Sequence, residues 1–286
     1  NASNALPTAV DTNANWQTDV PDIGNEPGAI NYANTLTNSS ADLILHNVSG
    51  WDPIAVGDVD GDGYGDFIDS LASGILYFGQ ALPSGLDTDV NWRSVDLGSN
   101  FDALTAAGDL DGDGLADFII SEGANAFAIF GKGGEWSSLN LSNGTVAESE
   151  NSVAVTEITR DADATNNFQN IYTQLGDING DGYADILIAG NPADNYGLKD
   201  NGAVYVLFGS ASDDSGVDQW DTDISLTNLA ENGQGFRITG ALDFDNLGQS
   251  SWIGLGDINA DGYDDFMVQA SGDAEGDDNG SGGSGS

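Results

Sequence analysis

Four copies of one acidic nonapeptide hold the residues of this chain that are best suited to chemistry. They read DVDGDGYGD from Asp58, DLDGDGLAD from Asp109, DINGDGYAD from Asp177 and DINADGYDD from Asp257, and are numbered loops 1 to 4. Each copy has a carboxylate or amide oxygen at positions 1, 3, 5 and 9, and its glycine at position 6 permits a sharp turn. Calcium prefers about six to eight hard oxygen ligands on a tightly turned loop. The sequence therefore predicts one calcium ion at each loop, about four in all.

The expected ligands are the side chains at positions 1, 3, 5 and 9 and the main-chain carbonyl at position 7. They are Asp58, Asp60, Asp62, Tyr64 and Asp66; Asp109, Asp111, Asp113, Leu115 and Asp117; Asp177, Asn179, Asp181, Tyr183 and Asp185; and Asp257, Asn259, Asp261, Tyr263 and Asp265. Acidic turns without metal are disfavoured, because clustered carboxylates repel one another when no cation is present. Asparagine replaces aspartate at position 3 of loops 3 and 4, so we expect weaker binding there than at loops 1 and 2.

An EF-hand is excluded by the spacing. Its loop needs a glutamate at position 12 and a helix after it. Position 12 is occupied here by Asp69, Ile120, Ile188 and Val268. The residues that follow each nonapeptide form short apolar runs, which are typical of buried strands. Each loop is therefore expected to join two strands.

The composition restricts the partners of this chain. The 47 acidic residues outnumber the 5 Lys and Arg residues, which gives a net charge of −42. Nucleic acid and anionic membranes are poor partners for such a field. The absence of cysteine excludes disulfides and thiolate metal sites. No apolar run approaches the roughly 20 residues of a membrane span, so no membrane insertion is expected. Many glycines and repeated calcium loops favour an all-β protein that is extracellular or at the cell surface.

The nonapeptides belong to a longer repeat. One strand enters each loop and a second leaves it. In the first three units a third strand ends in Phe-Gly, as in GILYFG, AFAIFG and GAVYVLFG, and is followed by a Trp segment and an outer strand such as GFRITG. This order predicts the four-stranded antiparallel blades of a β-propeller.

From about residue 50 to 270 the chain resembles the FG-GAP repeat family, the calcium-loop β-propellers of integrin α-subunit heads and of many large bacterial surface proteins. The resemblance is closest from GAVYVLFG through GFRITG to LGQSSWIGLGDINADGYDD. It implies calcium at the four nonapeptides and a place outside the cell. This sequence departs from the family pattern at Asn179, Asn259 and Ala260, which again indicates weaker binding at loops 3 and 4.

Three regions are expected. Residues 1–27 form an N-terminal extension or the outer segment of a closing blade, residues 28–271 form the propeller, and residues 272–286 form a flexible Gly/Ser/Asp-rich tail. We expect four blades, the last closed by N-terminal strands with residues 41–48 as its outer strand; a fragment of a seven-bladed ring is the alternative. The fourth unit lacks an evident third strand. Residues 28–36 fill it, or a neighbouring subunit does so by strand exchange, which would build a fibre.

No catalytic constellation is evident. The single histidine, His46, lies in an alternating strand-like run and has no nucleophile beside it. The recurring tryptophans are interpreted as packing residues. We therefore expect a non-enzymatic adhesion module or the repeating subunit of a surface fibre, with a surface glycan or a protein as an open choice of ligand. The alternative is a secreted carbohydrate-active hydrolase or lectin on a propeller scaffold.

Overall fold

The computed structural model describes residues 53–69, 74–80, 93–98, 101–122, 125–136, 154–159, 171–189, 198, 200–211, 220 and 223–272. The chain divides into two units, Asn1–Gly50 with Leu82–Asn91 and Trp51–Ala81 with Trp92–Ser286. Every described residue belongs to the second unit. The expected N-terminal extension, the closing strand at 41–48, His46 and the tail from 273 lie outside the described residues, so those predictions remain untested.

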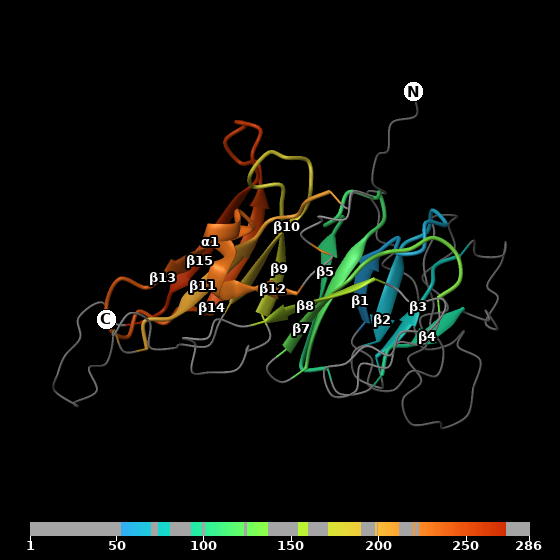
Figure 1. Ribbon diagram of the computed structural model, residues 1–286, viewed down its shortest axis with the longest axis horizontal. Helices are drawn as coiled ribbons and strands as arrows, with labels where there is room; N and C mark the ends of the chain where they lie inside the picture. Colours follow the sequence, from blue (N-terminus) through green and yellow to red (C-terminus); the bar gives the residue numbers. More distant parts are fainter. Residues whose placement is uncertain are drawn as a thin grey trace, which may run out of the picture. The chain divides into compact units, whose positions relative to one another are not determined.

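Two antiparallel sheets have four strands that follow one another in chain order (Figure 1). Sheet 1 contains β1 (Pro53–Gly57), β2 (Asp66–Asp69), β3 (Ile75–Tyr77) and β4 (Ser94–Asp96). Sheet 3 contains β9 (Ile171–Gly176), β10 (Asp185–Ala189), β11 (Ala203–Leu207) and β13 (Gly235–Thr239). Both sheets have the strand order that the repeat predicts, with the Phe-Gly strand third.

Sheet 2 has one strand more than expected. Its first four strands are β5 (Ala103–Gly108), β6 (Asp117–Glu122), β7 (Asn125–Ile129) and β8 (Val155–Thr159). The fifth is β12 (Ile224–Ser225), which runs parallel to β8. Two threonine hydroxyls of β8 anchor it: Thr156 Oγ1 donates to the Trp220 carbonyl, and Thr159 Oγ1 donates to the Ile224 carbonyl at 3.1 Å.

A short helical segment follows β12. It comprises a 3-10 turn, η2 (Leu226–Asn228), and the helix α1 (Leu229–Asn232), which ends at Gly233 with a left-handed φ of 73°. Leu226 and Leu229 are buried in the core between sheets 2 and 3. Among the described residues, no helix has the length and apolar character needed to cross a bilayer.

The fourth sheet is a hairpin of β14 (Leu247–Gly256) and β15 (Asp265–Ala270). The predicted pairing of its two strands is confirmed, with Trp252 opposite Val268 and Ile253 opposite Met267. The described residues thus give three sheets of four or five strands and one strand pair. They fit a propeller-like all-β fold; the number of blades and closure of a ring remain predictions.

Alternate side chains of the inner strands face different cores, as the two-residue period of a strand requires. In β6, Ile119 packs in one core with Ile186 of sheet 3. Its neighbours Phe118 and Ile120 pack in another core with Ile68 of sheet 1. Each fully buried aliphatic side chain contributes about 1.5–3 kcal/mol. Sheet 2 therefore joins its two neighbours through its opposite faces, as propeller blades do.

Candidate calcium loops

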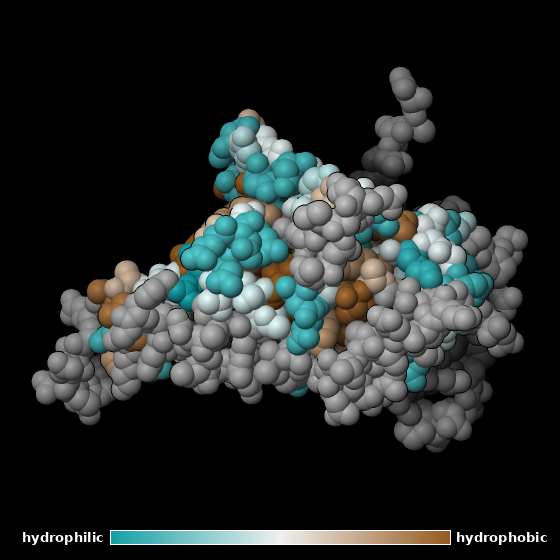
Figure 2. All heavy atoms as spheres, viewed as in Figure 1, coloured by the Kyte–Doolittle hydropathy of each residue, from teal (hydrophilic) through white to brown (hydrophobic). Residues whose placement is uncertain are grey.

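Each nonapeptide connects the first and second strands of a sheet, as the sequence predicts. The loops lie along one edge of the successive sheets, the upper edge in Figure 1. Hydrophilic residues cover this edge above β14 and β15 in Figure 2. Because the strands before and after each loop pair directly, the ends of the nonapeptide are held close together and its side chains converge.

Glycine at position 6 is required by the backbone. This residue has a positive φ in all four loops, where side chains with a Cβ are disfavoured. The values are 89° at Gly63, 87° at Gly114, 97° at Gly182 and 93° at Gly262. The turn then points successive main-chain N–H groups toward the side chain at position 1.

The acidic side chains order the loop from within. In every loop the position 1 carboxylate accepts a hydrogen bond from the N–H at position 6, and the position 5 carboxylate accepts one from the N–H at position 7. The first set measures 2.8 Å at Gly63, 3.0 Å at Gly114, 2.8 Å at Gly182 and 2.9 Å at Gly262. The second measures 2.8 Å at Tyr64, 2.8 Å at Leu115, 3.0 Å at Tyr183 and 3.0 Å at Tyr263. These hydrogen bonds hold the oxygens at positions 1 and 5 in a fixed orientation.

The position 9 aspartate closes each loop. In all four loops it accepts a hydrogen bond from the N–H at position 2, at 2.8 Å from Val59, 2.6 Å from Leu110, 2.8 Å from Ile178 and 3.1 Å from Ile258. In sheets 1 to 3 it also accepts one from the glycine of the Phe-Gly pair, at 2.6 Å from Gly79, 2.7 Å from Gly131 and 2.9 Å from Gly209. This carboxylate therefore ties the loop to the third strand of its own sheet.

Burial raises the pKa of three of these carboxyl groups. Desolvation is the main cause, opposed by the two main-chain hydrogen bonds and reinforced by neighbouring loop aspartates. It raises the pKa of Asp66 to about 6, that of Asp117 to about 8 and that of Asp185 to about 6. A bound cation would favour the charged form of each group. The arrangement is therefore one that a divalent cation would stabilise.

Three carboxylates converge in each of the first two loops. One oxygen from each of Asp58, Asp60 and Asp66 lies within 4.8 Å of the others, and the same holds for Asp109, Asp111 and Asp117. These all-oxygen donor sets suit calcium, which takes carboxylate and carbonyl ligands. Asp62 and Asp113 at position 5 are outside these clusters.

Loops 3 and 4 form no cluster of three carboxylates among the described residues. Position 3 is asparagine in these loops, so it supplies an amide oxygen and not a third carboxylate. As in loops 1 and 2, the side-chain oxygen at position 3 accepts the N–H at position 5. The distances are 3.0 Å from Asp181 to Asn179 and 2.8 Å from Asp261 to Asn259. The other expected side-chain ligands, Asp177, Asp185, Asp257 and Asp265, occupy the same loop positions as their counterparts, and the role of the position 7 carbonyls remains a prediction.

One cation at loop 1 was missed by the sequence reasoning. Arg93, just before β4, forms an ion pair with Asp60. Its guanidinium carbon lies 3.8 Å from the centre of the Phe78 ring, and its Nη1 donates to the Gly134 carbonyl at 3.1 Å. Arg93 therefore competes with any metal ion for Asp60. The only sequence signal was its rarity, as one of 5 basic residues in the chain.

Successive loops are hydrogen-bonded to one another. The N–H at position 8 donates to the position 1 carbonyl of the preceding loop. The distances are 2.9 Å from Ala116 to Asp58, 3.0 Å from Ala184 to Asp109 and 2.9 Å from Asp264 to Asp177. The side chain at position 7 covers the position 4 residue of the preceding loop, as Tyr183 covers Gly112. The loops thus form one continuous ladder, and ordering one loop supports the next.

The phenylalanine of the Phe-Gly pair packs against a tryptophan. Phe78 packs edge-on against Trp136 at 5.7 Å between ring centres, and Phe130 packs in the same way against Trp220 at 5.2 Å. Both tryptophans are buried, which confirms for these two the interpretation as packing residues. The glycine is required because a Cβ on Gly131 would lie 2.6 Å from the Leu115 Cβ.

Residues 173–207 match the FG-GAP repeat. The matched segment contains loop 3 together with β10 and β11, which are the elements that carry the nonapeptide and the Phe-Gly strand. The match supports a β-propeller module of the integrin-α type, in which such repeats commonly bind calcium.

Proposed function

We propose that this chain is a non-enzymatic, calcium-stabilised β-propeller module that acts outside the cell, as an adhesion module or as the repeating subunit of a surface fibre. The observation that supports it most is the convergence of three aspartates in loop 1 and three in loop 2, of which Asp66 and Asp117 are buried. Buried like charges are costly unless a cation is shared between them.

The proposed role of calcium is structural. A bound ion would offset the repulsion between carboxylates and hold positions 1 and 9 of one loop together. Because position 9 reaches the third strand and position 8 reaches the preceding loop, each site would join one sheet to its neighbour. Asp62, Asp113, Asp181 and Asp261 hold their loops in the turned form through the N–H at position 7.

A non-enzymatic role is supported by how the acidic side chains are used. The position 1 carboxylate of each loop accepts a main-chain N–H of its own loop, which holds its oxygens in an arrangement that suits ion binding. The net charge of −42 gives the solvated acidic surface expected of a protein in a calcium-rich or saline exterior.

Thermal unfolding with and without a calcium chelator tests the structural role. A ligand that binds only the folded chain stabilises it by about 2.7 kcal/mol when its concentration is 100 times the Kd. Chelation should therefore lower the Tm. The variant Asp111→Ala should lose part of the calcium effect, whereas the control Glu135→Ala, an exposed acid outside the loops, should keep it. Identical melting curves in calcium and chelator would refute this role.

Association is tested separately, by light scattering and electron microscopy of the protein in calcium. A fibre subunit should give particles whose mass grows with concentration. A stand-alone adhesion module should stay monomeric and bind a cell surface or an extracellular glycan or protein. Monomeric protein that binds no such surface would overturn the proposed function while leaving the calcium result intact.

A further inference from the structure

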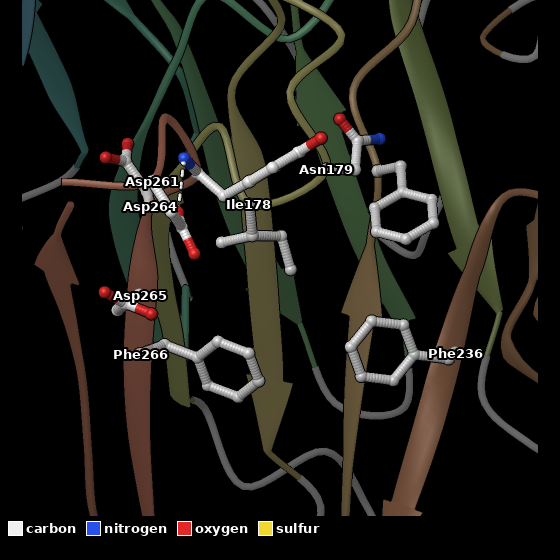
Figure 3. Close-up of a pocket in the computed structure, with 9 residues that line it drawn as sticks. Ile178, Asn179, Phe236, Asp261, Asp264, Asp265 and Phe266 are labelled. Carbon is white, nitrogen blue, oxygen red and sulfur yellow. Dashed lines mark hydrogen bonds between the residues drawn. The ribbon is translucent and has the colours of Figure 1, made fainter. Parts of the chain in front are cut away.

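A pocket of about 360 Å³ lies beside the strand pair β14–β15 (Figure 3). Phe236 of β13 and Phe266 of β15 flank it, and Ile178 of loop 3 extends between them. Tyr263, Asp264 and Asp265 of loop 4 also line it. The pocket is therefore built from sheet 3, sheet 4 and the two loops that connect their strands.

The equivalent position in sheets 1 to 3 is filled by the glycine of the Phe-Gly pair. In sheet 3, a Cβ on Gly209 would lie 2.6 Å from the Tyr183 Cβ and 2.9 Å from the Leu110 carbonyl oxygen, and Ala184 closes the third side. These neighbours occupy positions 7 and 8 of the glycine's own loop and position 2 of the preceding loop. At sheet 4 those positions are Tyr263, Asp264 and Ile178, and all three line the pocket.

Asp265 shows the same incomplete arrangement. Its counterparts Asp66, Asp117 and Asp185 each accept two main-chain hydrogen bonds, one of them from the Phe-Gly glycine. Among the residues that the structure describes, the hydrogen bond to Asp265 comes from Ile258, at 3.1 Å to Oδ2. In the other three sheets, the Oδ1 atom of the position 9 aspartate is the one that accepts the N–H of the Phe-Gly glycine.

The side of β15 that faces away from β14 corresponds to the side of β10 that pairs with β11. Within the described part of the chain, β10 pairs with both β9 and β11, whereas β15 pairs with β14 alone. Leu187 of β10 is fully buried, and its counterpart Met267 is 52% exposed. Leu187 packs in the core that contains Trp252, Phe266 and Val268 of sheet 4. Met267 lies on the face of sheet 4 that points away from sheet 3, and no further described sheet covers that face.

The third strands of sheets 1 to 3 indicate what kind of strand would pair with β15. Each is an antiparallel strand of mainly apolar residues that ends in Phe-Gly. The sequence contains this pair at Phe78, Phe130 and Phe208, and each is already used in its own sheet. The residues that follow β15, from 273 to 286, have Ala274 as their one apolar side chain. A fourth strand of this type is not found among the described residues.

We propose that the β15 edge and the adjoining pocket bind one antiparallel apolar strand that ends in an aromatic–glycine pair and belongs to a separate polypeptide. The main-chain hydrogen bonds of an added strand supply affinity, and the pocket supplies specificity. This goes beyond the proposed function, because it names a polypeptide ligand and does not require calcium at any loop.

The register follows from β10 and β11, where Leu187 lies opposite Val206 and Ile188 lies opposite Tyr205. A bound strand of the β11 type would therefore place its Val206 equivalent opposite Met267. The residues on either side of that equivalent point to the other face of the sheet.

Disulfide trapping tests the site and its register. Because the sequence contains no cysteine, the introduced cysteine is the one thiol of the protein. The protein carries Met267→Cys, and the probe is a synthetic peptide with the sequence of residues 201–210, NGAVYVLFGS, with one cysteine at the place of residue 205, 206 or 207. In a glutathione redox buffer, the cysteine at 206 should be trapped at least tenfold more than those at 205 and 207. Equal trapping at all three places would overturn the proposal.

Fluorescence anisotropy of the labelled, cysteine-free peptide with the unmodified protein gives the second readout, in calcium and in chelator. We expect saturable binding in at least one condition. A peptide with Gly209→Ala should bind at least tenfold more weakly, since its Cβ would meet Tyr263 and Asp264. No binding in either condition would show that another segment, such as residues 28–36, already covers the edge, and would overturn the proposal without affecting the calcium function.

Discussion

Loops 2 and 4 have nearly the same sequence pattern and very different surroundings. Leu110 at position 2 of loop 2 is fully buried, whereas Ile258 at the same position of loop 4 is 68% exposed. Asp117 at position 9 accepts two main-chain hydrogen bonds, and Asp265 accepts one from the described residues. The internal turn of the two loops is nonetheless the same, with position 1 accepting the N–H of Gly114 or Gly262.

The comparison shows that the nonapeptide determines the loop's own conformation, while the next sheet determines how far its ligands are buried. Loop 2 is covered by the Phe-Gly strand of its own sheet and by Trp220, whose indole N–H donates to the Leu110 carbonyl at 3.3 Å. Loop 4 has no such cover among the described residues. Ion affinity and stability should therefore differ between loops for reasons that the ligand residues alone do not give.

The largest contrast is expected from removing the position 9 carboxylate. In calcium, Asp117→Ala should reduce the free energy of unfolding by about 2–6 kcal/mol, since it leaves two buried N–H groups without an acceptor. Asp265→Ala should cost no more than half as much, because the one N–H among the described residues that loses its acceptor is the exposed N–H of Ile258. Both variants lose one expected calcium ligand, so their difference in urea unfolding reports the buried donors. Equal losses would contradict the comparison.

The glycine before each loop gives a second matched pair. Gly57 and Gly256 both have a positive φ, of 93° and 66°, so an alanine costs about 1–2 kcal/mol at either place. At Gly57 the new Cβ would also lie 2.5 Å from the Ala116 Cβ, whereas at Gly256 nothing lies within 4 Å. Overpacking should therefore add about 1–3 kcal/mol to Gly57→Ala alone. Chemical denaturation measures the free energy of unfolding of both variants. A larger loss for Gly256→Ala than for Gly57→Ala would contradict the expected overpacking.

A substitution at position 4 of loop 4 is expected to increase the stability of the protein. Ala260 has a φ of 61° where the other loops have glycine, at 74° in Gly61, 77° in Gly112 and 77° in Gly180. Ala260→Gly relieves a left-handed alanine and should stabilise the protein by up to about 1 kcal/mol, less the entropy that a glycine adds to the unfolded chain. The reverse change Gly61→Ala should destabilise. A fall in the Tm of Ala260→Gly would show that φ strain is not what distinguishes loop 4.

A further contrast is the pH dependence of the chelated protein. The folded-state pKa of Asp117 is raised from 3.8 to about 8, and those of Asp66 and Asp185 are raised to about 6. The folded chain then holds these protons more tightly than the unfolded chain, so this stabilisation is complete below about pH 4 and lost as pH rises through 6 and 8. The Tm in chelator should rise when pH falls from 9 toward 5. Asp117→Asn should remove the part near pH 8; a Tm that does not change with pH would count against buried neutral carboxyls.

Much of the fold and of the loop geometry could be predicted from local sequence. The spacing of acids and glycine within nine residues determines the turn, and the apolar runs on either side determine the strands, so β1–β2, β5–β6, β9–β10 and β14–β15 were predictable. The Phe-Gly strands β3, β7 and β11 were predictable for the same reason. These features depend on interactions between residues that are close in the chain.

The interactions between sheets could not be predicted in this way. The fifth strand β12 depends on Thr156 and Thr159, which lie more than sixty residues before it. The ion pair of Arg93 with Asp60 and the ladder from Ala116 to Asp58 also join distant residues. The glycines at positions 57, 108 and 176 were visible in the sequence as a repeat, but the close neighbour that each one accommodates was not.

Calcium binding by the loops is tested most directly by titrating metal-free protein with calcium in a calorimeter, beside four variants in which the position 1 aspartate of one loop is changed to alanine. About four sites are expected, and each of Asp58→Ala, Asp109→Ala, Asp177→Ala and Asp257→Ala should remove one. The tightest sites should be lost with loops 1 and 2, unless Arg93 holds Asp60 away from the ion, in which case loop 2 alone should be tightest. No heat of binding, or the same number of sites in all four variants, would contradict the assignment of calcium to these loops.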